Sequence, residues 1–445
     1  MRFWAALLLV AAPAWAEFLA GAARRGVTPD LKTLSPVYIA GFGQNRVATG
    51  VHDELAARCL AIGTGARPLV ICGVDSIGLF REDIERVRKL VPAALIVAAT
   101  HCHQTPDTMG LWGRSPGQSG INDGYNRFVV EQTAAAANDA LRGMKPAVVR
   151  LASVNPPELA GYFDDSRPPV VHDAEILALS VTGPAGEPIA TLVNWANHPE
   201  ALGSKNTLLS ADYLAYFYRR LEERLGGVAV FVNGAVGGMQ SPLGAKIADP
   251  ATGEPAPKES FRFAEVLGTR VADLVGEAVK KARPASIDRI EFRESLIRIP
   301  LANDGFRTAV AAGLFKGRKT LNDDGTMTAP VGYVRLARGA TPLVEAVLVP
   351  GEMYPELSVG GIQRYPGADF PDAPLEPPLK KMLRAPFRML FGLAGDEIGY
   401  IIPKAEWDDR APWLQNAPKR WYGEVNSVGP EAAPRIAEAV RSLVR

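Results

Sequence analysis

Residues Ala94–His103 read ALIVAATHCH, and the fold class can be inferred outward from them. A short apolar run that ends in polar residues is typical of a buried strand in an α/β sheet. Functional residues of α/β proteins gather where such strands end. His101 and His103 are two residues apart, so strand alternation would point both to one side and Cys102 to the other. An H-x-H pair here is a common way to present imidazoles to a metal ion or a substrate.

Strands and helices alternate on both sides of this stretch as far as Pro284. The pattern predicts an α/β fold, with a mixed, largely buried β-sheet flanked by helices and a strand-rich C-terminal portion that completes one domain. A sub-domain break is expected near position 284, if there is one. The expected strands are Ala56–Gly63, Leu69–Asp75, Ala94–Thr100, Ala147–Val154, Glu175–Val181, Ile189–Trp195 and Val228–Asn233, with strand-rich segments at Ile287–Pro300 and Val331–Pro350. The expected helices are Arg81–Leu90, Tyr125–Arg142, Tyr213–Leu225, Ser260–Ala282 and Arg435–Val444.

The bulk composition and the N-terminus restrict the class of protein. The 445 residues are 47% hydrophobic, and 49 basic residues balance 48 acidic ones, so no nucleic-acid partner is indicated. Residues 1–16 combine a positive start, the apolar run Phe3–Ala12 and an Ala14-Trp15-Ala16 cleavage signature, which predicts a signal peptide. We therefore expect an exported protein, periplasmic or secreted. The mature chain would begin near Glu17. We find no other apolar run in the sequence that is long enough to span a bilayer.

The chain has three cysteines, too few for a disulfide scaffold. Cys59 and Cys72 flank a Gly-rich turn at equal distances, so they could face each other across a hairpin. We expect two buried free thiols here, because disulfides between neighbouring strands are often strained.

A second histidine also follows an apolar strand. His198 lies in the segment NWANHP, just beyond Ile189–Trp195. Two strand ends that each offer a histidine could converge on one ion, and a catalytic zinc site needs three or four N or O ligands with an open position for water. Carboxylates or a phenolate would supply the further ligands. Of the remaining histidines, His52 either lines the pocket or pairs structurally with Asp53, and His172 is expected at the surface.

Six segments occur in the order of motifs known from the neutral ceramidases, and the chain resembles that family from about residue 38 to 435. Each segment alone would be weak, whereas six in order are fairly specific. The segments are THCHQTP (100–106), NWANHPEAL (194–202), VNGAVGGMQSP (232–242), VPGEMYPEL (349–357), GLAGDEIGYIIP (392–403) and RWYGEVNSVGPEA (420–432).

The resemblance implies one catalytic domain over 17–445 and one zinc ion per chain, with ligands that suit Zn²⁺. These ligands would be His101, His198, Glu352 and Tyr400. His103 would lie beside the metal and donate to the developing oxyanion or shuttle a proton, with Tyr422 as a second donor. The attacking group would be a zinc-activated water or, in the alternative mechanism, Ser241. We favour water, since the sequence shows no Ser-His-acid triad.

The implied activity is zinc-dependent hydrolysis of an N-acyl amide bond, in ceramide or a related lipid. The alternatives are an esterase or amidase with a non-ceramide substrate, and a non-catalytic exported binding protein. The family's C-terminal immunoglobulin-like domain has no counterpart here, and Gln104-Thr105 replaces a small Ser-Gly pair. A family arginine is missing near Asn155, and nearby Arg167 is an uncertain replacement. The basic, apolar stretch Lys380–Phe391 would contact a membrane surface transiently or form a buried helix.

Overall fold

The computed structural model describes residues 18–65, 67–165 and 167–445, so the predicted signal peptide (1–16) lies outside the described residues. Two five-stranded sheets form the middle of the molecule. The first has the order β5-β4-β3-β1-β6, and the second has the order β11-β9-β8-β7-β12. The first sheet consists of β1 (Leu19–Gly26), β3 (Ala56–Gly63), β4 (Leu69–Val74), β5 (Ala94–Ala99) and β6 (Lys145–Pro146). The second consists of β7 (Val148–Val154), β8 (Ile176–Thr182), β9 (Pro188–Trp195), β11 (Val228–Asn233) and β12 (Pro284–Ala285).

A third sheet, with the order β13-β14-β15-β17, packs below the first two. Its strands are β13 (Arg289–Pro300), β14 (Thr326–Arg338), β15 (Thr341–Leu348) and β17 (Phe387–Phe391). Two further pairs of very short strands lie outside these sheets: β2 (Gly50–Val51) with β10 (Leu208–Leu209), and β16 (Glu352–Met353) with β18 (Tyr400–Ile401).

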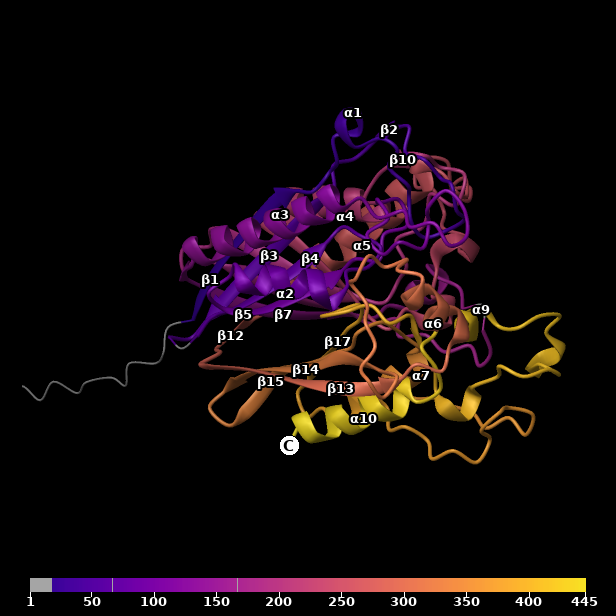
Figure 1. The fold of residues 1–445 in the computed structure, drawn as a ribbon. Coiled ribbons are helices and arrows are strands. Elements are labelled where there is room, and N and C mark those ends of the chain that lie inside the picture. Colours follow the sequence, from indigo (N-terminus) through magenta and orange to yellow (C-terminus); the bar gives the residue numbers. More distant parts are fainter. Residues whose placement is uncertain (1–17, 66, 166) are drawn as a thin grey trace, which may run out of the picture.

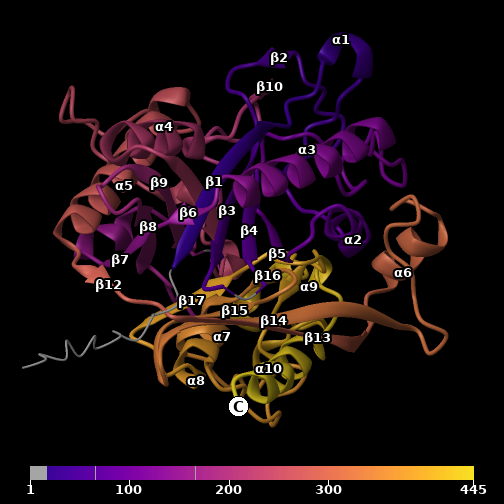
Figure 2. The same cartoon turned by 90° about the vertical axis from the view of Figure 1, so that its left-hand side faces the viewer.

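Helices cover the outer faces of this stack of sheets (Figures 1 and 2). The helices above the first two sheets are α2 (Arg81–Lys89), α3 (Asp123–Arg142), α4 (Tyr213–Leu225) and α5 (Phe261–Lys281). Those on the far side of the third sheet are α7 (Pro355–Val359), α8 (Leu379–Met382) and α10 (Ala432–Leu443). The remaining helices are α1 (Leu31–Leu34), α6 (Asp304–Ala311) and α9 (Tyr422–Val425).

Three apolar cores fill the spaces between these layers. The first joins α3, α4 and α5 to one face of the two upper sheets, and the second fills the space between those sheets and the third. The third core joins the lower face of the third sheet to α10. Because side chains alternate along a strand, each central strand supplies two cores at once, which explains why the strands read as continuous apolar runs. The predicted α/β class and buried sheet are confirmed.

The long helices begin and end where the sequence predicts. The side chain of Asn122 caps α3 by accepting from the amide of Tyr125, and Gly143 follows its last residue. One central strand, β1, is absent from the prediction, although it pairs with both β3 and β6. Its sequence LAGAARRG has no β-branched residue, so its propensity for a strand is weak. The strand-rich segment Val331–Pro350 contains the second half of β14 and all of β15, which a turn at Gly339 separates.

The expectation of two free thiols at Cys59 and Cys72 is wrong. These residues lie directly opposite each other on the antiparallel strands β3 and β4, and a disulfide bond joins them. The antiparallel register brings both sulfur atoms to the same face of the sheet, with the Cα atoms 4.1 Å apart. Cys102 is a buried free thiol whose Sγ contacts the carbonyl of Ser210.

The stretch Lys380–Phe391 lies mostly within the protein. Its first half is α8 and its second half is β17, an edge strand of the third sheet. Lys380 is buried, and its Nζ lies 2.7 Å from Oδ1 of Asp173. The expectation of a buried helix is therefore correct only for the start of this segment, because its end is a strand, and contact with a membrane surface stays a prediction. No helix in the described part of the chain is long and apolar enough to cross a bilayer.

Candidate metal centre and pocket

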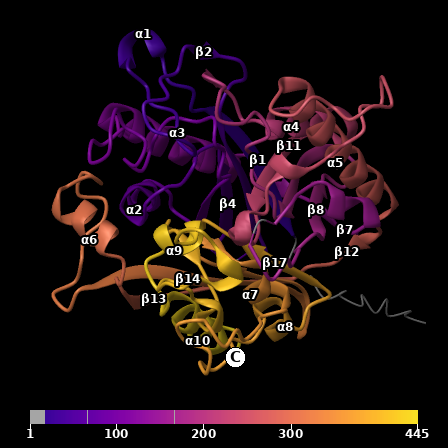
Figure 3. The same ribbon diagram turned by 90° about the vertical axis from the view of Figure 1, so that its right-hand side faces the viewer.

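Two loops bring the histidines together, one after β5 and one after β9. The main-chain amide of His103 donates to the carbonyl of Pro199 at 3.0 Å, which ties the loops to each other. Asn233, at the end of β11, strengthens the tie, since its side-chain amide donates to the carbonyls of Thr100 and Asn197. Figure 3 shows the molecule from the side on which α9 lies, with β4 and β11 above α9 in this view.

The backbone does not follow strand geometry at the H-x-H pair. Strand β5 ends at Ala99, and His101 has a φ of 66°, in the left-handed region that non-glycine residues seldom occupy. Such conformations persist where the surroundings enforce them, and they cluster at functional sites. The imidazoles of His101 and His103 do lie together, with ring centroids 5.0 Å apart, but a turn in the loop places them there rather than strand alternation.

Glu352 and Tyr400 come from the small parallel pair β16 and β18, in which they are direct partners in register. This pair places the carboxylate against both histidines. Oε2 of Glu352 lies 3.2 Å from Nε2 of His101 and 3.1 Å from Nε2 of His198. The structure therefore brings three of the four predicted metal ligands into contact, and it places Tyr400 beside them.

The contacts of the Nδ1 atoms show which nitrogen carries the proton in His101 and in His198. Nδ1 of His101 lies 2.7 Å from the carbonyl of Ile77, and Nδ1 of His198 lies 2.8 Å from the carbonyl of Gln240. A carbonyl oxygen only accepts, so both Nδ1 atoms carry protons and both Nε2 atoms face Glu352. Two nitrogen lone pairs and a carboxylate oxygen would repel one another unless positive charge lay between them.

The electrostatics of the cluster agree with this need for positive charge. Burial would raise the pKa of Glu352, but His101 and His198 outweigh it and hold that pKa well below its usual value. Burial would lower the pKa of His198, yet the hydrogen bond to Glu352 raises it above its usual value. Both shifts indicate that the cluster favours positive charge beside this carboxylate. Two imidazoles and a carboxylate suit Zn²⁺, so these residues fit the ion that the fold family implies.

Tyr400 differs from the other three predicted ligands because its phenol still carries a proton. Its ring is buried, and its hydroxyl lies 3.1 Å from Sδ of Met239. Burial raises the pKa of this phenol well above its usual value, and the charge of Glu352 adds to the effect. Tyr400 is therefore a neutral phenol in the metal-free chain, and it would lose its proton only to a bound cation.

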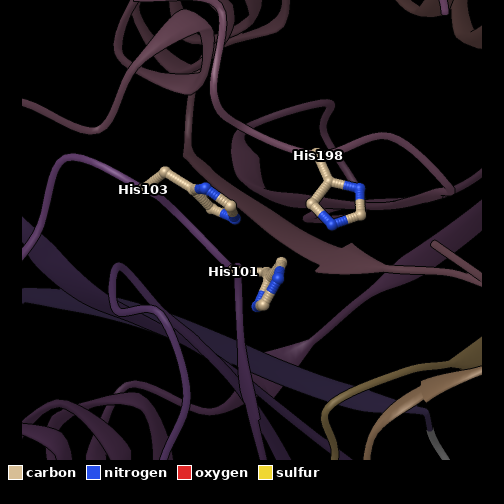
Figure 4. Close-up of side chains that lie close together, drawn as sticks. All are labelled: His101, His103 and His198. Carbon is tan, nitrogen blue, oxygen red and sulfur yellow. The ribbon is translucent and has the colours of Figure 1, made fainter. Parts of the chain in front are cut away.

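His103 belongs to the same cluster of imidazoles but has a different partner. Its ring centroid is 5.5 Å from that of His198, and the three rings face a common space (Figure 4). The ligand atoms of these three histidines lie within 4.8 Å of one another, so the geometry also permits His103 to hold an ion. However, Nδ1 of His103 lies 3.1 Å from Oε2 of Glu200, a buried carboxylate that the sequence analysis did not single out.

The pair His103–Glu200 has the electrostatics of a neutral base and its orienting carboxylate. Burial lowers the pKa of His103 to about 4, despite the charge of Glu200. Burial opposes ionisation of Glu200, but the contact with His103 and the hydroxyl of Ser241 lower its pKa to about 2. Gly41 makes room for the imidazole, since a Cβ atom at this position would lie 2.4 Å from Cγ of His103 and φ is +101°.

Ser241 lies next to this site rather than in its pocket. Its side chain accepts a hydrogen bond from the amide of Leu243, and its neighbour Gln240 holds His198. Ser241 is not among the residues that line the pocket, whereas Tyr422 is. Tyr422 is 56% exposed at the start of α9, and its ring centroid is 5.8 Å from that of Tyr400.

The pocket that contains the cluster is largely apolar and open to solvent on one side. Its cavity volume is about 80 Å³, and the space around it continues into open solvent. His101, His103, Glu352 and Tyr400 form its polar end. Its apolar walls include Phe80, Met109, Trp112, Phe306, Val310 and Phe315.

Sequence reasoning missed one further polar residue in this pocket, Glu397. It is buried, and burial together with the charge of Glu352 raises its pKa well above the usual value. It lies three residues before Tyr400 within a segment quoted for the family resemblance, and only that position could have drawn attention to it.

Three other residues weighed from the sequence lie elsewhere. Arg167 is buried and donates to the hydroxyl of Tyr354 and to Glu424, away from the pocket lining. His52 forms the structural pair with Asp53, at 2.9 Å, and stacks on Phe261. His172 is half-buried rather than on the surface, with its ring edge against Phe163.

Known structures share this architecture, although the sequence matches no family model and no curated protein. The crystal structure of a neutral ceramidase from Pseudomonas aeruginosa has a TM-score of 0.72 and 15% sequence identity, and the similarity covers 96% of this chain and 74% of that one. A ceramidase complexed with C2 has a TM-score of 0.71 at 15% identity, over 96% of this chain and 75% of the other. The ordered motifs of the sequence and the similarity of the structures agree, and this chain has the fold of the neutral ceramidases.

Proposed function

We propose that this chain is a zinc-dependent hydrolase that cleaves the amide bond of an N-acyl lipid, either ceramide or a close relative. One observation carries the proposal: Nε2 of His101, Nε2 of His198 and Oε2 of Glu352 converge at the polar end of an apolar pocket. A structural zinc site would be closed by four protein ligands, often cysteines. This cluster instead opens onto a pocket, which favours catalysis over a binding protein with structural zinc.

His101, His198 and Glu352 would hold the ion, with Tyr400 as a fourth ligand once its phenol is deprotonated. When bound, zinc would polarise the amide carbonyl and lower the pKa of a water molecule to about 7. The apolar walls would hold the hydrocarbon part of the substrate and exclude water around the amide.

His103 would move the proton during the reaction. Both of its ring nitrogens are buried and have no hydrogen-bond partner among the described residues, and Oε2 of Glu200 lies 3.1 Å from Nδ1. A neutral imidazole in this position can take a proton from the attacking water and deliver it to the leaving nitrogen. Tyr422, at the pocket wall, would donate to the oxygen that becomes negative in the transition state.

Water is the proposed nucleophile, and Ser241 is the alternative. The hydroxyl of Ser241 is engaged with the amide of Leu243, and Ser241 does not line the pocket. The hydroxyl of Ser241 also helps to lower the pKa of Glu200, which supports a role in orienting that carboxylate rather than in attack on the carbonyl.

Export, zinc content, domain organisation and partners are also proposals. We propose export through the signal peptide at 1–16, one zinc ion per chain and one catalytic domain over 17–445. The third sheet does begin just after 284, where a sub-domain break was expected. The proposed partner is a lipid or small-molecule substrate, with transient contact at a membrane surface.

The test measures zinc content and hydrolysis of N-acyl-sphingosine on the same purified mature protein. His101→Ala and His198→Ala should each lose both zinc and fatty-acid release. His172→Ala is a matched control, since His172 lies outside the pocket, and it should retain both. Zinc without cleavage of ceramide would move the proposal to other amides or esters. No zinc in wild-type protein expressed with ample zinc would favour the non-catalytic binding protein.

A further inference from the structure

Glu397 lines the pocket and is a buried carboxyl group without a full set of hydrogen-bond partners. Its Oε1 accepts a hydrogen bond from the amide of Gly399 at 2.7 Å. Its Oε2 is buried and has no hydrogen-bond partner among the described residues. A buried polar atom without a partner destabilises the folded state, so its presence calls for an explanation.

The position of Glu397 is close to the reacting end of the pocket. A Cβ atom on Gly78 would lie 3.1 Å from Cγ of Glu397, so the glutamate packs directly against Gly78. The preceding residue, Ile77, accepts the hydrogen bond from Nδ1 of His101. Glu397 therefore lies on the pocket wall near the proposed metal ligands.

The charged groups near Glu397 that the structure describes do not form a hydrogen bond with its Oε2. Lys319 also lines the pocket, but its Nζ pairs with Asp396, which also accepts from the main-chain amides of Arg81 and Glu397. The ammonium group is thus committed to Asp396. Oε2 of Glu397 is left for a group that enters the pocket.

We propose that Glu397 is a specificity-determining residue that pairs through Oε2 with a hydroxyl group which the substrate carries close to the scissile amide. This inference rests on the proposed function and adds a residue to its substrate recognition. A hydroxyl can both donate and accept, so the pairing works with either form of the carboxyl group. The hydroxyl could belong to the amine part, as in a long-chain amino alcohol, or to carbon 2 of the acyl chain.

The test compares three N-acyl lipids of equal chain length: one with a hydroxyl in the amine part, one with a hydroxyl on the acyl chain, and one with neither. Wild-type protein should prefer one hydroxylated lipid by at least about tenfold in kcat/KM, the equivalent of one good hydrogen bond. Glu397→Leu should abolish the preference by losing activity on that lipid alone. Glu397→Gln should keep most of the preference, because an amide side chain also donates and accepts.

Glu356 provides a matched control. It is a buried glutamate whose Oε2 also has no partner among the described residues, and it does not line the pocket. Glu356→Leu and Glu356→Gln should leave the preference unchanged. Thermal melting of every variant separates loss of recognition from loss of folding.

A binding measurement on metal-free protein separates this inference from the proposed function. Quenching of Trp112 fluorescence, in the pocket wall, would report binding of a long-chain amino alcohol, a 2-hydroxy fatty acid and the counterparts of both without the hydroxyl. Discrimination that Glu397→Leu removes, in a protein that hydrolyses none of the lipids, would support Glu397 and refute the hydrolase. Hydrolysis with a preference that Glu397→Leu does not change, or with no preference in the wild type, would refute the role of Glu397 and leave the hydrolase.

Discussion

Glu352→Gln is the most direct perturbation of the proposed metal centre. Glutamine has nearly the same size, so it removes the anionic oxygen that faces both histidines without opening a cavity. The remaining groups would be two imidazoles and a neutral phenol. We expect zinc to bind this variant at least about 100-fold more weakly, since even groups that only support a ligand contribute 10- to 100-fold to affinity.

The expected size of the effect follows from the length of the chain. An entropy of unfolding of about 2.1 cal/mol/K per residue gives about 0.9 kcal/mol/K for 445 residues. Free zinc at about 100 times the wild-type Kd stabilises the folded state by about 2.7 kcal/mol, which raises Tm by about 3 °C. At the same zinc concentration, a 100-fold weaker site contributes only about 0.4 kcal/mol, or less than about 0.5 °C.

The assay is thermal unfolding of chelator-treated protein with and without zinc, each variant being compared with its own metal-free form. Glu356→Gln, a buried glutamate four residues along the chain, should keep the full zinc shift. A full shift in Glu352→Gln would refute the assignment of the metal to this cluster. His103→Ala separates the two possible ligand sets: it should keep the shift if His103 acts on protons, and lose it if three histidines hold the ion.

Three further predictions concern the surroundings of the site. Glu200→Gln should lower kcat by about 10- to 100-fold with little change in KM and should alter the pH profile, because His103 loses its orienting carboxylate; an unchanged kcat would contradict this role. Gly41→Ala should lower both activity and Tm, the latter by about 1–3 °C, because of its positive φ and the contact with His103. Burial, followed by the charge of Glu406, raises the pKa of Glu356 to about 9, with Asp165 adding to the effect and Arg167 opposing it. The folded state therefore binds this proton more tightly than the unfolded state, so stability should fall as pH rises from about 4 to 9, by up to about 1.4 kcal/mol per pH unit. Glu356→Gln should flatten that decline in Tm measured against pH, and an equally steep decline would contradict the assignment.

Parts of the fold that depend on local pattern could be predicted from the sequence. Apolar runs and helical periodicity located the main strands and long helices, since both signals are properties of neighbouring residues. The same patterns placed His101 and His198 at the ends of two strands. Strand β1 escaped prediction because its Ala- and Gly-rich sequence carries no local signal, although pairing on both edges makes it stable.

The remaining site residues depend on contacts between distant parts of the chain. Glu352 and Tyr400 become partners through strands of two residues each, too short for any periodic pattern, so only the family resemblance suggested them. The proximity of Glu200 to His103, the exclusion of Ser241 from the pocket and the unpaired oxygen of Glu397 appear only in the packed structure. The disulfide between Cys59 and Cys72 likewise depends on the register of two strands.

The sequence by itself thus determined the α/β class and the two histidines that follow buried strands, because local periodicity encodes both. The tertiary structure alone decided which carboxylates face those histidines and which hydroxyl or carboxyl groups lie within the pocket. The physical reason is that burial, charge and hydrogen bonding at this site arise from loops and short strands that are distant in the sequence and meet only when the three sheets pack together.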